Sequence, residues 1–163
     1  MNDILNVKSV YKTYYSHKDN TKIEALININ FKLYENETLG IVGESGCGKS
    51  TLAKIIVQLE HLTSGEINYK NNILNNLSYR DLIKYKKDIQ LVFQDPYSSL
   101  NPRLNIYNIL EEPLIIHSSL NKKKRLEKCR QIIELVGLQE QSLFKYPHEF
   151  SGGQRQRIVI ARA

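Results

Sequence analysis

Residues 38–51 of this 163-residue chain read T-L-G-I-V-G-E-S-G-C-G-K-S-T. The apolar run Leu39–Val42 predicts a short buried strand that stops at Gly43, and a helix is expected from Lys49 to about Glu60. The spacing G-x-x-x-x-G-K-S between a strand and a helix is typical of a loop that wraps around a polyphosphate. The stretch therefore predicts an α/β fold built on a phosphate-binding loop.

The chemistry of this loop follows from its residue types. Glycines let the backbone approach a phosphate chain and turn N–H groups toward it, and the helix N-terminus adds a positive field. Lys49 supplies a full charge for the β- and γ-phosphates, and the Ser50 hydroxyl can bind Mg²⁺. A glycine-rich turn without a ligand is the alternative, which the flanking strand and helix disfavour. The predicted nucleotide-binding residues here are Gly43, Glu44, Ser45, Gly46, Cys47, Gly48, Lys49, Ser50 and Thr51.

Composition and charge narrow the classes of protein. A hydrophobic content of 41% and a net charge of +6 fit one globular domain. The sequence has no apolar run long enough to span a membrane and no signal-peptide pattern at its start, which indicates a cytoplasmic location. Cys47 and Cys129 are too few for a disulfide framework or a metal site. Much of the basic excess lies in residues 122–125 without a nucleic-acid-binding signature, so no nucleic-acid partner is expected.

Two alternating runs precede the phosphate loop. Ile4–Tyr15 predicts an edge strand, and Ile23–Leu33 predicts a second strand that pairs with it in an antiparallel layer; a polar loop, residues 16–21, joins them. Tyr14 closes the first strand and could stack on an adenine, because a flat aromatic ring recognises a purine face without hydrogen bonds. An ordinary tyrosine at the end of a strand is the alternative.

The later part of the chain is expected to alternate short strands and helices. Residues 88–94 predict an apolar strand that delivers Gln94 and Asp95 to a loop, where Asp95 could hold a Mg²⁺-bound water. One helix is expected to be interrupted at Pro113. Helix starts are predicted at four capping residues, Ser78, Asn105, Asn121 and Ser151.

A second anion site is predicted where the last of these helices begins. Ser151 caps the helix, and Gly152 and Gly153 leave its first N–H groups uncovered. A polar cap with no ligand is the alternative.

Three motifs together resemble one known family. The phosphate loop, V-F-Q-D-P at residues 92–96 and F-S-G-G-Q-R-Q-R at residues 150–157 resemble the ATP-binding subunit of an ABC transporter, most closely in the oligopeptide/dipeptide (and nickel) importer group. The resemblance implies a P-loop NTPase fold, the ABC-type nucleotide-binding domain, with an N-terminal antiparallel β layer and a helical subdomain. It divides the chain into residues 1–94 (β layer and ATP-binding core), 95–150 (helical subdomain) and 151–163 (signature motif and the start of its helix).

The resemblance also implies roles for residues at matching positions. Residues 43–51 match the Walker A loop, and Tyr14 matches an aromatic residue that stacks on adenine. Gln94 matches a glutamine that reaches Mg²⁺ and the attacking water, which displaces the interpretation of Asp95 as the metal carboxylate. Lys49 and Gln94 are thus the expected catalytic residues, Ser50 and Gln94 the expected Mg²⁺ ligands, and ATP and Mg²⁺ the cofactors. The signature motif, which binds the γ-phosphate of ATP held by a partner subunit, is matched by Ser151, Gly152, Gly153 and Gln154.

The implied partners are a second ATPase subunit, the same or different, with ATP sandwiched between the two, and membrane permease subunits. The permease would contact residues 96–116 and hold the protein peripherally at the inner face of the cell membrane. The implied function is to couple ATP binding and hydrolysis to peptide import.

In this family an apolar strand ending in Asp-Glu and a switch histidine follow the signature motif, and both would lie beyond Ala163. With a core incomplete at the C-terminus, the 163 residues are expected to bind ATP without efficient hydrolysis and to be poorly stable. A non-hydrolysing, ATP-dependent interaction module is the alternative. A DNA-associated ABC ATPase is a third possibility, which the absence of sustained heptads between the two motifs disfavours.

Overall fold

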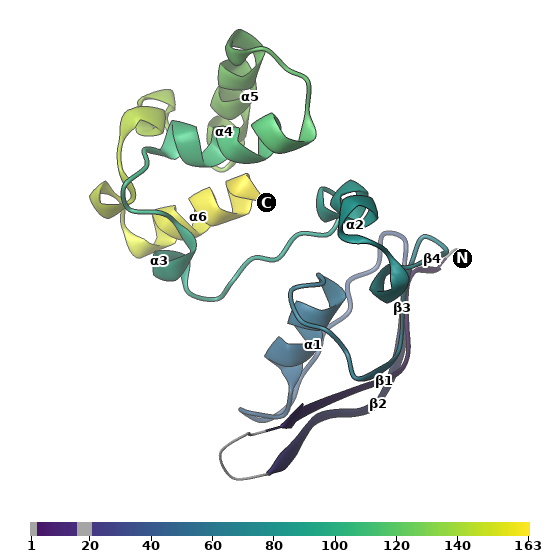
Figure 1. Cartoon of the computed structure of the whole chain (residues 1–163). Coiled ribbons are helices and arrows are strands. Elements are labelled where there is room, and N and C mark those ends of the chain that lie inside the picture. The colour runs from purple at the N-terminus through teal and green to yellow at the C-terminus, as the bar shows by residue number, and fades with distance from the viewer. Residues whose placement is uncertain (1–2, 16–20) are drawn as a thin grey trace. The chain divides into compact units, whose positions relative to one another are not determined.

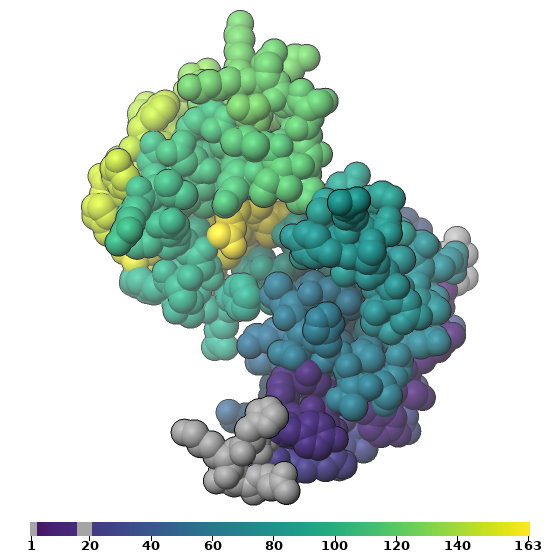
Figure 2. Space-filling view, viewed as in Figure 1, coloured from purple at the N-terminus to yellow at the C-terminus, as the bar shows by residue number. Residues whose placement is uncertain are grey.

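A computed structural model describes residues 3–15 and 21–163 of the chain. The chain divides into two compact units, Met1–Ile89 and Gln90–Ala163. Figure 1 shows the first unit as a twisted β layer with helices beside it, and the second unit as a group of helices. The space-filling view shows both as packed bodies (Figure 2).

The first unit contains a four-stranded antiparallel sheet in the order β2-β1-β3-β4. The predicted antiparallel layer is confirmed, but the prediction that the first strand is an edge strand is wrong. Because β3 pairs with its second side, β1 lies inside the sheet, where Val7 and Val10 are buried. The strands are β1 (Asp3–Tyr15), β2 (Lys22–Tyr34), β3 (Ser64–Tyr69) and β4 (Asn72–Ile73).

Helices cover this sheet and close the first hydrophobic core. Leu52 and Ile55 of α1 pack with the sheet residues in one buried cluster. α1 ends at Ile56, short of the expected Glu60, because Gln58 takes a left-handed conformation with φ of 58°. The predicted Ser78 cap is confirmed, since its Oγ accepts a hydrogen bond from Asp81 N at 3.3 Å. The helices are α1 (Lys49–Ile56), the 3₁₀ turn η1 (Leu74–Asn76) and α2 (Tyr79–Lys86).

Two expected strands are absent from the described residues. Leu39–Val42 and residues 88–94 have no strand structure, and no described strand pairs with either segment. Val42 is 93% exposed, and Phe93 is 43% exposed. Both segments are apolar, but a buried strand also needs hydrogen-bonded neighbours on its flanks, and the apolar pattern carries no information about those.

The second unit is built from helices around its own core, which includes Ile106, Ile133 and Ile158. The interruption predicted at Pro113 is wrong, because α4 continues through the proline to His117. Burial of apolar side chains in its first turns stabilises the helix despite the missing proline N–H. The elements are α3 (Pro96–Ser99), α4 (Ile106–His117), α5 (Lys122–Leu135), η2 (Glu140–Phe144), η3 (Pro147–Glu149) and α6 (Gly152–Arg162).

A buried carboxylate joins α4 to α5. Glu111 Oε1 accepts hydrogen bonds from Tyr107 Oη at 2.6 Å and from Arg125 Nε at 2.8 Å. Burial alone would raise the pKa of Glu111, but the hydrogen bonds from Tyr107 and Arg125 outweigh it and hold this pKa below its ordinary value. The same burial and the contact with Glu111 raise the pKa of Tyr107 to about 12. Glu111 therefore remains charged near neutral pH, with Tyr107 and Arg125 both donating to its Oε1.

Candidate nucleotide-binding site

Gly48 anchors the phosphate loop against the sheet. Its φ is 96°, and a Cβ added there would lie 2.4 Å from Ala25 O and 2.9 Å from Leu26 Cδ2. Only glycine fits this conformation and this close approach to β2. The sheet thereby fixes the point where the loop becomes helix α1.

Lys49 folds back over the loop that precedes it. Its Nζ lies 2.8 Å from Gly43 O, 2.6 Å from Glu44 O and 3.4 Å from Cys47 Sγ. The ammonium group therefore lies against the loop backbone, where the glycine spacing would place phosphates. Residues 43–51, predicted to bind the nucleotide, form one continuous segment that consists of the loop and the first residues of α1.

The N-terminus of α1 has no side-chain cap. Its N-cap is Gly48, and no acidic residue lies in its first turn. The other described helices of at least eight residues are all capped by side chains, namely those of Ser78, Asn105, Asn121 and Ser151. The first N–H groups of α1 and its positive helix end can therefore face an anion, which fits a phosphate group.

Tyr14 lies near the end of β1, paired with Ile23 of β2. Its side chain is 37% exposed, and Lys12 Nζ lies 4.7 Å from the ring centroid. Lys12 is itself held by Glu60 Oε1 at 2.7 Å and by His61 O at 2.6 Å. The hydrogen bond from Lys12 lowers the pKa of Glu60. The Tyr14 side chain is thus partly exposed with Lys12 over its ring, and stacking on adenine stays a prediction.

The signature segment begins α6 in the second unit. Ser151 Oγ accepts from Gln154 N at 3.4 Å, and Gln154 Oε1 accepts from Ser151 N at 3.0 Å. The S-x-x-Q spacing at residues 151–154 is typical of this reciprocal capping box, in which Gln154 has a structural role beside its predicted role as a phosphate ligand. A Cβ on Gly153 would meet nothing within 4 Å. The tip of α6 is thus open beside Gly153.

Gln94 and Asp95 precede α3 in the same unit. Asp95 Oδ1 accepts from Tyr97 N at 2.9 Å, and Oδ2 accepts from Ser98 N at 3.3 Å. These hydrogen bonds, that from Tyr97 foremost, lower the pKa of Asp95. The carboxylate acts as a helix cap, which fits its rejection as a metal ligand. Gln94 is exposed. It belongs to the second unit and Ser50 to the first, so binding of one Mg²⁺ ion by both residues stays a prediction.

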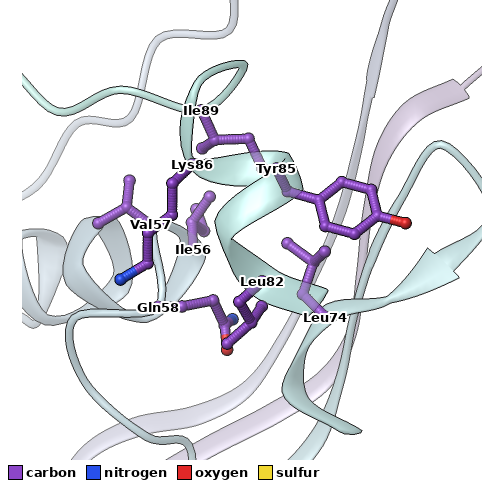
Figure 3. A pocket seen from close by; sticks show the side chains of 8 residues that line it. All are labelled: Ile56, Val57, Gln58, Leu74, Leu82, Tyr85, Lys86 and Ile89. Atoms are coloured by element: carbon purple, nitrogen blue, oxygen red, sulfur yellow. The ribbon is translucent and has the colours of Figure 1, made fainter. Parts of the chain in front are cut away.

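An apolar pocket between α1 and α2 is a different feature (Figure 3). It is lined by residues such as Ile56, Leu82 and Tyr85. Its cavity volume is about 10 Å³, room for about one water molecule. A nucleotide does not fit in this cavity, which is therefore not the candidate site.

A glycine loop followed by a lysine on an uncapped helix N-terminus defines a P-loop nucleotide-binding protein. The family model described as ABC transporter matches residues 26–163, and the chain belongs to this family. None of the described helices combines the length and apolar character that crossing a membrane requires.

Curated relatives agree with the family and with the resemblance to peptide importers. The dipeptide transport ATP-binding protein DppF of Haemophilus influenzae is 52% identical over 86% of this chain and 43% of its own length. The oligopeptide transport ATP-binding protein OppF of Lactococcus lactis is 42% identical over 100% of this chain and 53% of its own length. The chain therefore spans about half the length of these relatives.

Solved structures confirm the expected P-loop NTPase fold. The dimeric structure of MJ0796, a bacterial ABC transporter cassette, has a TM-score of 0.85 and 35% identity, covering 97% of this chain and 68% of that one. A dimeric post-hydrolysis state of the same cassette, bound to ADP and Pi, has a TM-score of 0.83 and 33% identity, with the same coverage.

Proposed function

We propose that this chain is the nucleotide-binding part of an ATP-binding subunit that drives peptide import through an ABC transporter. The observation that carries the proposal is the Lys49 ammonium group held against the phosphate loop at the uncapped N-terminus of α1. That arrangement offers one full charge and free N–H groups to a triphosphate.

The chain's own residues divide the work of binding MgATP. Lys49 and the first N–H groups of α1 bind the β- and γ-phosphates, and Tyr14 stacks on the adenine. Ser50 and Gln94 bind Mg²⁺, which neutralises phosphate charge when it is present. Gln94 also orients the attacking water. The likeness to a cassette bound to ADP and Pi supports this assignment.

A second ATPase subunit completes the nucleotide site. Residues 151–154 at the tip of α6 face the γ-phosphate of ATP held by that partner, so ATP is sandwiched between two subunits. The dimeric state of the similar cassettes supports this arrangement. Closing of the ATP-bound pair is then the movement that can be passed to a membrane partner.

Permease subunits dock on residues 96–116 and hold the protein at the cytoplasmic face of the membrane. Exposed apolar side chains in this segment, with Tyr97 61% exposed and Ile116 63% exposed, support a docking role. Peptides as the cargo are supported by the names of the similar relatives.

Residues 1–163 by themselves bind ATP much better than they hydrolyse it. The segment that leads into the phosphate loop, Leu39–Val42, has no strand partner among the described residues, so no completed sheet holds the loop in register. With this segment unpaired, residues 1–163 on their own act as an ATP-dependent interaction module with little turnover.

The test uses a strain lacking the native protein. Complementation with the wild-type gene should restore uptake of a labelled dipeptide, and the Lys49→Ala gene should not, although both proteins accumulate equally. Uptake that returns fully with Lys49→Ala would overturn the proposed coupling to ATP. In parallel, calorimetric titration of residues 1–163 should detect binding of MgATP. Release of phosphate from ATP by the same residues should stay far below that of the native protein.

A further inference from the structure

One arginine connects three parts of the second unit. Arg155, in the first turns of α6, stacks over the ring of Tyr97 of α3, with 4.1 Å between its Cζ and the ring centroid. Its Nε donates to Phe150 O at 3.0 Å, and its Nη2 donates to His148 O at 3.5 Å. Arg155 therefore links α6, which carries it, to α3 and to the chain that leads into Ser151.

This contact differs from the other cation–π pairs among the described residues. Those pairs join a lysine to a tyrosine close in sequence, at ring-centroid distances of 4.7 Å, 5.0 Å and 4.9 Å. The Tyr97–Arg155 pair is shorter and joins two different helices. An arginine presents a flat guanidinium that stacks on a ring while its edges donate hydrogen bonds, which a lysine cannot do.

Two further contacts join the same helices. Arg162 Nη1, at the other end of α6, donates to Ser99 O at 2.7 Å. A Cβ added to Gly152 would lie 4.0 Å from Tyr97 Oη, so the phenol ring lies beside the first residue of α6. The short helix α3 is thus attached to α6 at both ends, and it begins directly after Gln94 and Asp95.

We propose that Tyr97 and Arg155 are positioning residues that transmit a displacement of α3 to the Ser151 tip of α6. The proposal rests on the proposed function, in which a permease contacts the segment containing α3 and the Ser151 tip binds the partner's ATP. A permease that moves α3 then reorients the α6 tip, because the stacked pair and the Arg162–Ser99 hydrogen bond make α3 and α6 move together.

The experiment uses the native protein reconstituted with its permease in liposomes, and MgATP turnover is measured with and without the permease. Tyr97→Leu removes the ring, and Arg155→Lys keeps the charge but removes the flat guanidinium. Each should lower stimulation by the permease about three- to tenfold, the size expected for loss of one cation–π contact. MgATP affinity without the permease should stay at the wild-type value. Stimulation is compared at saturating permease, so that weaker docking by Tyr97→Leu is not counted as lost transmission, and at a urea concentration of zero, where both variants stay folded.

Three controls separate transmission from general damage. Tyr97→Phe keeps the ring and should retain wild-type stimulation. Tyr79→Leu removes an exposed tyrosine that pairs with Lys86 outside this unit, and it should also retain stimulation. The double variant should be no worse than Arg155→Lys alone, because both changes break the same link.

Wild-type stimulation in Tyr97→Leu, or additive losses in the double variant, would overturn the link while leaving the proposed function intact. A wild-type protein that neither binds MgATP nor responds to the permease would instead refute the proposed function, and the link with it.

Discussion

Lys49 is the residue on which the candidate site depends most. Its ammonium group is hydrogen-bonded to three atoms of the phosphate loop, Gly43 O, Glu44 O and Cys47 Sγ. Lys49→Ala should weaken MgATP binding about 10- to 100-fold, because a charge-assisted hydrogen bond to phosphate is lost. Calorimetric titration measures the change. Lys54→Ala, an exposed lysine at the other end of α1, is the matched control and should bind like the wild type.

A substitution at Gly48 tests the backbone conformation of the phosphate loop, whereas Lys49→Ala tests its charge. Gly48→Ala should lower the free energy of unfolding by about 1–3 kcal/mol, since its Cβ would collide with Ala25 O and its φ is unfavourable for alanine. Urea denaturation measures the loss. Gly40→Ala meets nothing within 4 Å and should be neutral; equal losses in both variants would contradict the close approach of loop and sheet.

The phosphate loop can be predicted from the sequence because a backbone that wraps around phosphates requires glycine, lysine and serine at a fixed spacing. The Ser151 cap can be predicted for a similar reason, since capping is a local interaction. The Tyr97–Arg155 pair was not predicted. These residues lie far apart in the chain, and neither has a local pattern that names the other as its partner.

At the scale of elements, the pairing of α4 with α5 depends on the charge of Glu111. Glu111→Gln should cost about 2 kcal/mol of unfolding free energy at pH 7, because the charge-assisted hydrogen bonds from Tyr107 and Arg125 are weakened. The folded-state pKa of Glu111 lies below the ordinary 4.5. Its contribution is therefore complete above pH 4.5 and is lost as the pH falls through the folded-state pKa.

Urea denaturation of residues 1–163 between about pH 3 and pH 7 measures this effect. The gap between the wild type and Glu111→Gln should shrink in acid. Glu127→Gln, an exposed glutamate on α5, is the control and should show little difference at any pH. A gap for Glu111→Gln that stays constant down to pH 3 would show that the charge does not stabilise the helix pair.

Elements with local start signals were predicted well, and elements that depend on distant partners were not. The caps at Ser78, Asn105 and Asn121 are confirmed. Leu39–Val42 and residues 88–94 are apolar runs without a described strand partner. The helix through Pro113 shows the opposite case, in which burial of neighbouring side chains overrides a local break signal.

At the scale of the whole molecule, one chain carries two complementary parts of the proposed nucleotide site. The first unit provides the Lys49 loop, and the second provides the Ser151 tip of α6. In a pair of subunits, each nucleotide would lie between the loop of one and the tip of the other. The proposed arrangement would make ATP a requirement for association, so changes at the Lys49 loop and at the Ser151 tip should have different effects.

The most direct test mixes two variants of the native protein and measures MgATP-dependent pairing by sedimentation velocity. Lys49→Ala alone should bind ATP too weakly to pair, and Ser151→Arg alone should bind ATP but not pair. Mixed together, they should form pairs, because one interface then joins an intact Lys49 loop to an intact Ser151 tip. Ser151→Arg pairing as well as the wild type, or a mixture that stays monomeric while the wild type pairs, would contradict the shared site.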